Sequence, residues 1–235
     1  MSDHLTKSYD EELRRLDGMV ATMGNLAGEQ LDAVLDAAER CDAEIAARVV
    51  EREPEADRLE HQIDNLVVRL LALRQPVAID LRMILSALRI ANELERICDH
   101  AEDMAKRLMA LGTGGAGPVR SLVNLGRFAA EMVRDAMRAY VERDAPRAQQ
   151  VWDRDRELDE MYTALFRELL TYMIEDPRRI SASSHMLFMA RDLERVGDRA
   201  TNIAEMVRYL VSGVPVEEER PKADATKSIM LATAP

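Results

Sequence analysis

Four pairs of acidic residues are the features of this chain best suited to chemistry. In each pair the two residues are four positions apart, which places both carboxylates on one face of a helix, about one turn apart. The pairs are Glu53 with Asp57, Glu95 with Asp99, Asp155 with Asp159, and Glu194 with Asp198. Spacing alone is a weak signal, because 43 acidic residues in a chain of 235 give about eight such pairs by chance if the chain is helical.

The positions of the pairs strengthen the signal. The sequence predicts breaks between helices at Gln75-Pro76 and at Pro177. Residues at equal distances before and after such a turn lie at the same height in an antiparallel helical hairpin. The acids expected at the same height are Glu53 with Asp99 and Asp57 with Glu95 about the first turn, and Asp155 with Asp198 and Asp159 with Glu194 about the second. Each hairpin is therefore expected to bring four carboxylates together.

Such a group of carboxylates has a chemical use. Four carboxylates at one place repel one another unless cations neutralise their charge. Several carboxylate oxygens suit Mg, Mn, Ca or iron, and zinc can also bind to them. Asp103 and Asn202 lie one turn further along the same faces and could add a ligand or a hydrogen bond. The pattern predicts a metal site in each half of the chain.

Two other interpretations stay open. The acids can form a solvated surface whose salt-bridge partners are Arg52, Arg96, Arg154 and Arg195. A ferritin-like di-iron enzyme would need Glu-x-x-His on two helices, but none of the four histidines follows a Glu by three positions. We interpret His100, whose counterpart in the other half is Arg199, as a surface residue. A nucleophile elbow, a glycine-rich phosphate loop and a Cys-His signature are also missing, so an enzyme is not expected.

Composition favours an all-α protein. Hydrophobic residues make up 47% of the chain and aromatic residues only 4%, and the abundance of Ala, Leu, Met, Glu and Arg favours helices over sheets. A formal net charge of −11 argues against nucleic acid or an anionic membrane surface as the main partner. The chain starts without a basic and apolar signal sequence, and its apolar runs are too short for membrane insertion. We therefore expect a cytoplasmic protein.

Helical periodicity divides the chain into six helices. We expect helices at about 11–40, 43–73 and 80–111 in the first half, and at about 118–141, 144–174 and 178–210 in the second, with Asp42 capping the second helix. A glycine-rich linker at 112–118 separates the halves. Pro54 is expected to mark a kink or a local restart of the second helix. Periodicity is lost from Pro215 onward, which predicts a flexible tail.

The two halves are copies of each other. Gly24 matches Gly126 and Asp42 matches Asp144, while the third helices match at a slightly smaller shift, as Glu95 does Glu194. Short up-down connections make the helices of each half antiparallel neighbours. We predict two tandem three-helix bundles related by internal duplication, over residues 1–113 and 118–213, followed by a flexible tail over residues 214–235.

Two segments resemble the paired signature of a known family. Residues 93–99, Glu-Leu-Glu-Arg-Ile-Cys-Asp, and residues 193–205, which begin Leu-Glu-Arg-Val-Gly-Asp-Arg, resemble the PhoU family, as does the turn Arg74-Gln75-Pro76. The resemblance covers about residues 5–212 in the order and spacing of the family. Because two signatures, the turn and the duplication agree, the resemblance is specific.

The resemblance implies a function as well as a fold. It implies a cytoplasmic negative regulator of phosphate uptake and of the phosphate-starvation response, without catalytic activity. Such a regulator would couple the ATPase subunit of a phosphate ABC transporter to a PhoR-type sensor histidine kinase, and a homodimer is expected. It would hold iron, zinc, manganese or magnesium ions on each bundle. The ligands carried over are Glu53, Asp57, Glu95, Asp99, Asp155, Asp159, Glu194 and Asp198, with Asp103 and Asn202 beside them.

The sequence departs from the family pattern at two positions. Cys98 replaces the glycine of the first signature, whereas Gly197 keeps it in the second. A small residue there is expected to allow close helix packing, so Cys98 either packs differently or offers a soft ligand. Pro54, between Glu53 and Asp57, is expected to weaken Glu53 as a ligand.

Overall fold

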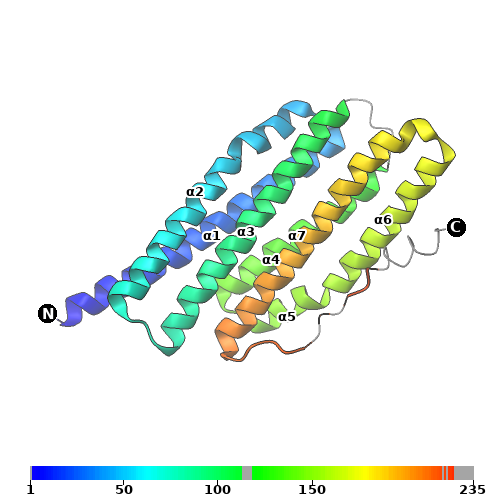
Figure 1. Cartoon of the computed structure of the whole chain (residues 1–235). Helices are drawn as coiled ribbons and strands as arrows, with labels where there is room; N and C mark the ends of the chain where they lie inside the picture. The colour runs from blue at the N-terminus through cyan, green and yellow to red at the C-terminus, as the bar shows by residue number, and fades with distance from the viewer. Residues whose placement is uncertain (1, 113–117, 219, 221, 225–235) are drawn as a thin grey trace.

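The computed structural model describes residues 2–112, 118–218, 220 and 222–224, and every regular element among them is helical (Figure 1). The elements are α1 (Ser2–Arg40), α2 (Ala43–Arg74), α3 (Ala78–Leu111), α4 (Val119–Glu142), α5 (Ala145–Asp153), α6 (Asp155–Glu175), the 3-10 helix η2 (Pro177–Arg179) and α7 (Ile180–Ser212). The all-α fold with a repeated three-helix unit is confirmed. Most of the predicted glycine-rich linker, residues 113–117, lies outside the described residues.

Side-chain caps begin the second helix of each repeat. Asp42 accepts hydrogen bonds from the backbone N–H groups of Glu44 and Ile45, and Asp144 accepts one from that of Arg147. These caps satisfy donors that the first helical turn leaves unpaired, each stabilising the helix by about 1 kcal/mol. The cap predicted at Asp42 is confirmed.

Two helix predictions need correction. The helix expected at 144–174 is divided at Arg154 into α5 and α6, because the backbone hydrogen bonds shift there: the N–H groups of Glu157 and Leu158 both donate to the carbonyl oxygen of Arg154. The hydrophobic period continues across this point, so the pattern could not show the break. By contrast, α2 continues through Pro54, so no new helix starts at that residue. The first helix also starts earlier than predicted, at Ser2.

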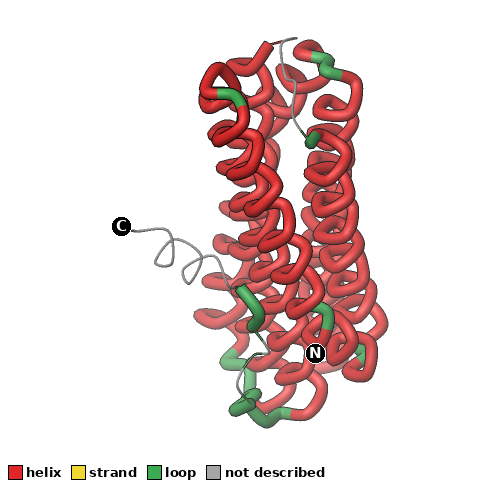
Figure 2. Tube along the Cα trace, turned by 90° about the vertical axis from the view of Figure 1, so that its right-hand side faces the viewer, coloured by secondary structure: helices red, strands yellow, loops and turns green. Residues whose placement is uncertain are grey.

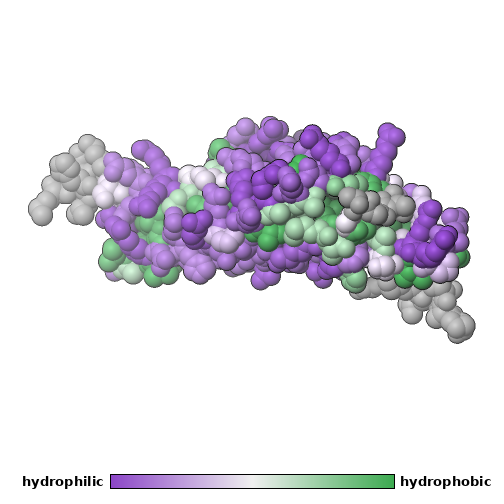
Figure 3. All heavy atoms as spheres, turned by 90° about the horizontal axis from the view of Figure 1, so that it is seen from above, coloured by the Kyte–Doolittle hydropathy of each residue, from purple (hydrophilic) through white to green (hydrophobic). Residues whose placement is uncertain are grey.

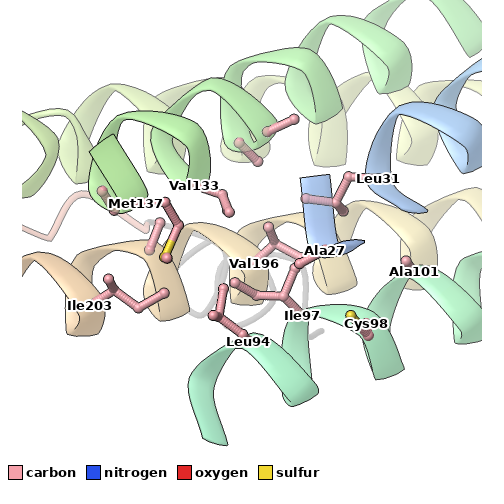
Figure 4. Close-up of a cluster of buried hydrophobic side chains, with 14 of the residues drawn as sticks. Ala27, Leu31, Leu94, Ile97, Cys98, Ala101, Val133, Met137, Val196 and Ile203 are labelled. Carbon is pink, nitrogen blue, oxygen red and sulfur yellow. The ribbon is translucent and has the colours of Figure 1, made fainter. Parts of the chain in front are cut away.

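The helices lie roughly along one direction in an elongated slab (Figures 1 and 2). The first and third helices of the two repeats, α1, α3, α4 and α7, pack against each other in the middle, with α2 on one edge and α5 and α6 on the other. Hydrophobic residues from all four central helices form one core (Figure 4). In the described part of the chain no helix combines the length and apolarity needed to span a bilayer, and the face in Figure 3 is mostly hydrophilic.

The repeats meet through reciprocal contacts. A Cβ atom added to Gly24 of α1 would lie 2.7 Å from Cε of Met137 on α4, and one added to Gly126 of α4 would lie 2.1 Å from Cδ2 of Leu35 on α1. Gly24 and Gly126 are equivalent positions of the duplication, and so are Leu35 and Met137. An interface in which each copy presents the same patch to the other is the mark of twofold symmetry. The duplicated halves therefore pack like the two subunits of a symmetric dimer.

A smaller residue packed opposite Cys98 compensates for the replacement of the signature glycine by this cysteine. A Cβ atom added to Gly197 on α7 would lie 1.9 Å from Cδ2 of Leu158 on α6, so the glycine makes room for the leucine. In the first repeat the equivalent residues are Cys98 and Ala56, and both are buried. The larger side chain of the pair lies on the second helix of the hairpin pair in one repeat (Leu158 on α6) and on the third helix in the other (Cys98 on α3). Burial raises the pKa of Cys98 to about 12, as do the charges of Asp99 and Glu95, so the residue is a protonated core thiol.

This exchange predicts a coupled pair of substitutions. Gly197→Cys alone is expected to lower the free energy of unfolding by about 2 kcal/mol, because Leu158 must move out of a packed interior. Leu158→Ala alone leaves a cavity and is expected to cost about 3 kcal/mol. The double variant reproduces the pair of the first repeat and should be more stable than the sum of the two losses predicts. Urea denaturation of the four proteins measures the coupling, and additive losses would contradict it.

The interpretation of His100 as a surface residue is wrong. Its side chain is mostly buried between α3 and α7, with Nδ1 3.4 Å from Oδ1 of Asp192. Asp192 is itself buried, and its Oδ2 lies 3.7 Å from Nε of Arg107 on α3. The counterpart Arg199 could not reveal this pairing, because Asp192 comes from the other repeat. His100 and Arg107 therefore join the two repeats.

Candidate metal-binding sites

The first acidic cluster consists of Glu53, Asp57, Glu95 and Asp99, which α2 and α3 bring together. A contact between the two helices shows the register of this hairpin: Nδ2 of Asn92 donates to Oε1 of Glu60 at 3.2 Å. These two residues are also equally far from the turn at Gln75-Pro76. Residues one and two helical turns further from the turn therefore face each other across the same seam.

Electrostatic effects show that the acids of the first cluster act on one another. Burial raises the pKa of Glu95 to about 7, and the charge of Asp99 adds to the shift. The pKa of Glu53 is raised by burial and then by the charge of Asp57. The pKa of Asp99 is also raised by burial, and Asp57 contributes to that shift across the helix pair. The ionised carboxylates of the cluster therefore repel one another, and their surroundings stabilise them less well than water does.

Neighbours of the first cluster add to this charge. Asp103 is exposed one turn beyond Asp99, and its charge contributes to the raised pKa of Asp99. Glu60 and Glu102, which the sequence did not single out, act in the same way on Glu95 and Glu53, respectively. Within the described side chains, no Lys or Arg forms an ion pair with the four acids of the cluster. Among the described residues, the first cluster is therefore not covered by cationic side chains.

The second acidic cluster consists of Asp155, Asp159, Glu194 and Asp198, on α6 and α7. It is more buried than the first: Asp155 and Asp159 are each 1% exposed and Glu194 is 4% exposed. Burial raises the pKa of Asp155 to about 6, although Arg220 opposes the shift. Burial and then the charge of Asp198 raise the pKa of Glu194 to about 7.

Two carboxylate oxygens of the second cluster are buried without a hydrogen bond to any described residue. They are Oδ2 of Asp155 and Oε2 of Glu194. The other oxygen of Asp155 accepts a hydrogen bond from the hydroxyl of Thr201 at 3.3 Å, and Oε1 of Glu194 lies 3.7 Å from Nη1 of Arg191. Buried polar atoms are usually paired, so these two oxygens are suited to a ligand that supplies positive charge.

Residues after α7 cover the second cluster. Nη1 of Arg220 donates to Oδ1 of Asp198 at 2.9 Å, and Nζ of Lys222 donates to the same oxygen at 2.7 Å. Arg220 also donates to Oδ1 of Asn202, whose amide nitrogen donates to Glu93 on α3 at 3.2 Å. Sequence reasoning missed Arg220 and Lys222, since the segment lacks periodicity. It was predicted to be a flexible tail, and its last residues, 225–235, lie outside the described ones.

The donor set fits hard or borderline cations. Both clusters offer carboxylate oxygens, which Mg, Mn and iron ions accept, and zinc also binds to carboxylates. Among the described residues, no three His, Cys, Asp or Glu side chains already form a coordination shell. The ten candidate ligands thus fall into two acidic groups, with Asp103 and Asn202 at their edges.

Comparisons with known proteins agree with this architecture. A sequence profile of the PhoU domain matches residues 20–108 and 122–207, one match in each repeat. A protein of Xylella fastidiosa (strain 9a5c) named phosphate-specific transport system accessory protein PhoU homolog is 48% identical over 229 residues, covering 97% of each chain. A protein of the same name from Caulobacter vibrioides (strain NA1000 / CB15N) is 42% identical over 95% of this chain and 98% of its own.

A solved structure shows the same fold. The crystal structure of PhoU from Pseudomonas aeruginosa superimposes with a TM-score of 0.85 at 38% sequence identity, covering 88% of this chain and all of the other. The profile matches both repeats, and the relatives extend over nearly the whole length. The resemblance seen in the two signatures is therefore confirmed, and the chain belongs to the PhoU family.

Proposed function

We propose that this chain is a metal-binding accessory protein of phosphate transport that acts as a negative regulator of phosphate uptake and of phosphate-starvation signalling. The relatives that match it over nearly its whole length carry the name phosphate-specific transport system accessory protein. Its partners are the ATPase subunit of a phosphate ABC transporter and a PhoR-type sensor histidine kinase. It works in the cytoplasm as a homodimer without catalytic activity.

The observation that supports metal binding is the pair of buried oxygens in the second cluster. Oδ2 of Asp155 and Oε2 of Glu194 are buried and form no hydrogen bond within the described part of the chain. Leaving such groups unsatisfied costs about 1–3 kcal/mol each, which a bound cation would offset. The first cluster supports the same proposal, because its acids raise one another's pKa and lack an ion pair among the described side chains.

Elemental analysis and Mn²⁺ binding test this function. The purified protein is expected to bind Mn²⁺ at both clusters, and more tightly at the first. The Asp99→Ala, Asp198→Ala double variant is expected to lose at least about tenfold in affinity at each cluster, because a carboxylate ligand is missing from each. In cells, the same variant should fail to repress a phosphate-starvation reporter when phosphate is abundant.

A control variant separates ligand loss from the change in charge. Asp36 and Asp153 are exposed acids outside the clusters, so Asp36→Ala, Asp153→Ala removes the same charge and should leave binding and repression unchanged. If the wild-type protein binds no Mn²⁺ and the Asp99→Ala, Asp198→Ala variant represses normally, the chain is a helical scaffold whose acids only solvate its surface.

A further inference from the structure

The chain reverses direction directly after α7. Gly213 ends this helix with φ +75°, in the left-handed region, and its N–H donates to the carbonyl oxygen of Tyr209 at 2.8 Å. A glycine adopts this conformation without the steric strain of other residues. The described residues that follow, called here the return segment (residues 214–218, 220 and 222–224), then run back beside α5 and α6 (Figure 1).

Cationic side chains of the return segment lie against the second acidic cluster. Arg220 and Lys222 both donate to Oδ1 of Asp198, at 2.9 and 2.7 Å. Nε of Arg220 also lies 3.9 Å from Oδ2 of Asp155, one of the two buried oxygens without a hydrogen bond. Charge-assisted contacts of this kind are about twice as strong as neutral ones. Two side-chain cations thus lie where the cluster would hold metal ions.

Backbone groups of the return segment satisfy a third acid. The N–H groups of Ala223 and Asp224 both donate to Oδ2 of Asp159, at 2.7 and 3.1 Å. The carboxylate of Asp224 in turn lies 3.6 Å from Nη1 of Arg191, which also approaches Glu194. The segment therefore contacts the second cluster with donors from three successive residues, 222–224, and from Arg220.

In the part of the chain that the structure describes, the first acidic cluster has no counterpart to this cover. Its four acids form no ion pair with any described Lys or Arg, and the neighbouring Glu102 pairs with Lys106 at 2.6 Å. The two clusters come from equivalent positions of the duplication, so their acids alone do not explain the difference. Among the described residues, what differs is the return segment, which follows the last helix of the second repeat.

We propose that the return segment is an internal ligand of the second cluster that competes with metal cations for it. Arg220 and Lys222 occupy Oδ1 of Asp198, and the two N–H groups occupy Oδ2 of Asp159. A cation held by all four acids would compete for these oxygens. Cation binding at the second cluster therefore releases the segment, whereas the first cluster binds cations without this step. This inference rests on the proposed cation binding.

The single tryptophan of the chain reports on the position of the segment. Nε1 of Trp152 donates to Oε1 of Glu205 at 3.1 Å, and Nη2 of Arg220 lies 3.4 Å from the same oxygen. Arg208 stacks on the indole ring at 5.6 Å and pairs with Glu218 of the segment at 3.1 Å. Release of the segment should therefore change the emission of Trp152.

The test measures Mn²⁺ binding to the second cluster in an Asp99→Ala background, which disables the first cluster. Arg220→Ala with Lys222→Ala is expected to tighten Mn²⁺ binding on the order of tenfold, because a cation no longer has to displace the segment. A chain that ends at Gly213 should behave in the same way. In the wild-type protein, titration with diamagnetic Mg²⁺ should shift the emission of Trp152, and in the truncated chain this shift should be absent.

The control removes two other arginines. Arg127 and Arg134 pair with Glu39 and Asp32 on the surface between α1 and α4, so Arg127→Ala with Arg134→Ala makes the same change in net charge and should leave Mn²⁺ affinity unchanged. Equal affinities with and without Arg220 and Lys222, while the wild-type first cluster binds Mn²⁺, overturn the competition alone. Absence of binding in every variant overturns the proposed function too.

Discussion

Glu194→Gln is expected to raise the free energy of unfolding of the cation-free protein by about 2–3 kcal/mol at pH 8. Burial and the charge of Asp198 raise the pKa of Glu194 from 4.5 to about 7. At pH 8 the carboxylate is ionised in a place that disfavours its charge, which glutamine removes with almost the same shape. The lost contact with Arg191 at 3.7 Å offsets part of the gain.

The pH dependence of this effect has a defined sign. Below pH 4.5 the carboxyl is protonated in both the folded and the unfolded chain, so the variant and the wild type should be equally stable. Between pH 4.5 and 7 the folded chain binds more protons than the unfolded one, and the stability of the wild type falls as the pH rises. Urea denaturation with a chelator at a series of pH values measures the difference.

An exposed glutamate provides the control for this prediction. Glu160 on α6 is 58% exposed and pairs with Arg156 at 3.0 Å, so Glu160→Gln should change the free energy of unfolding by less than about 0.5 kcal/mol at any pH. A Glu194→Gln variant that is less stable than the wild type at pH 8 would show that the carboxylate is adequately solvated. The prediction links stability to function, since the acids that would hold a cation destabilise the fold without one.

Local signals in the sequence predicted most of the fold. Asp42 marks a helix start because its side chain reaches the next backbone donors, and this chemistry lies within a few residues. The register of the first hairpin follows from its turn, since antiparallel helices of uniform rise keep equal distances level, as the contact of Asn92 with Glu60 shows. The clustering of acids is therefore a consequence of turn position and helix geometry alone.

The periodicity of the sequence could not predict contacts between segments that are far apart in the chain. Arg220 and Lys222 meet Asp198 only because the chain reverses at Gly213, and a segment without periodicity gives no sign of where it returns. Likewise, His100 is buried by Asp192 from the other repeat. In both cases the partner lies on another element, so the side chain's environment depends on packing that spacing along one helix does not encode.

Ile97→Ala is expected to lower the free energy of unfolding of the whole chain by about 3–4 kcal/mol. Ile97 is fully buried on α3. Figure 4 shows it in the core among side chains of α1 and α7, such as Ala27 and Val196. Deleting three carbon atoms there leaves a cavity that helices packed on several sides cannot close. Urea denaturation followed by far-ultraviolet circular dichroism measures the loss.

The same variant tests whether the repeats unfold together. Ile97 lies in the first repeat and Trp152 in the second. The emission of Trp152 therefore follows the half of the chain that the substitution does not touch. Because one core joins α1, α3, α4 and α7, the transition seen by Trp152 should move to lower urea with the overall transition.

Val68→Ala on α2, where the side chain is 65% exposed, is the control and should move neither transition. If the Trp152 transition stayed in place while the overall transition split in two, each repeat would be stable without its neighbour, and the reciprocal contacts of Gly24 and Gly126 would contribute little to folding.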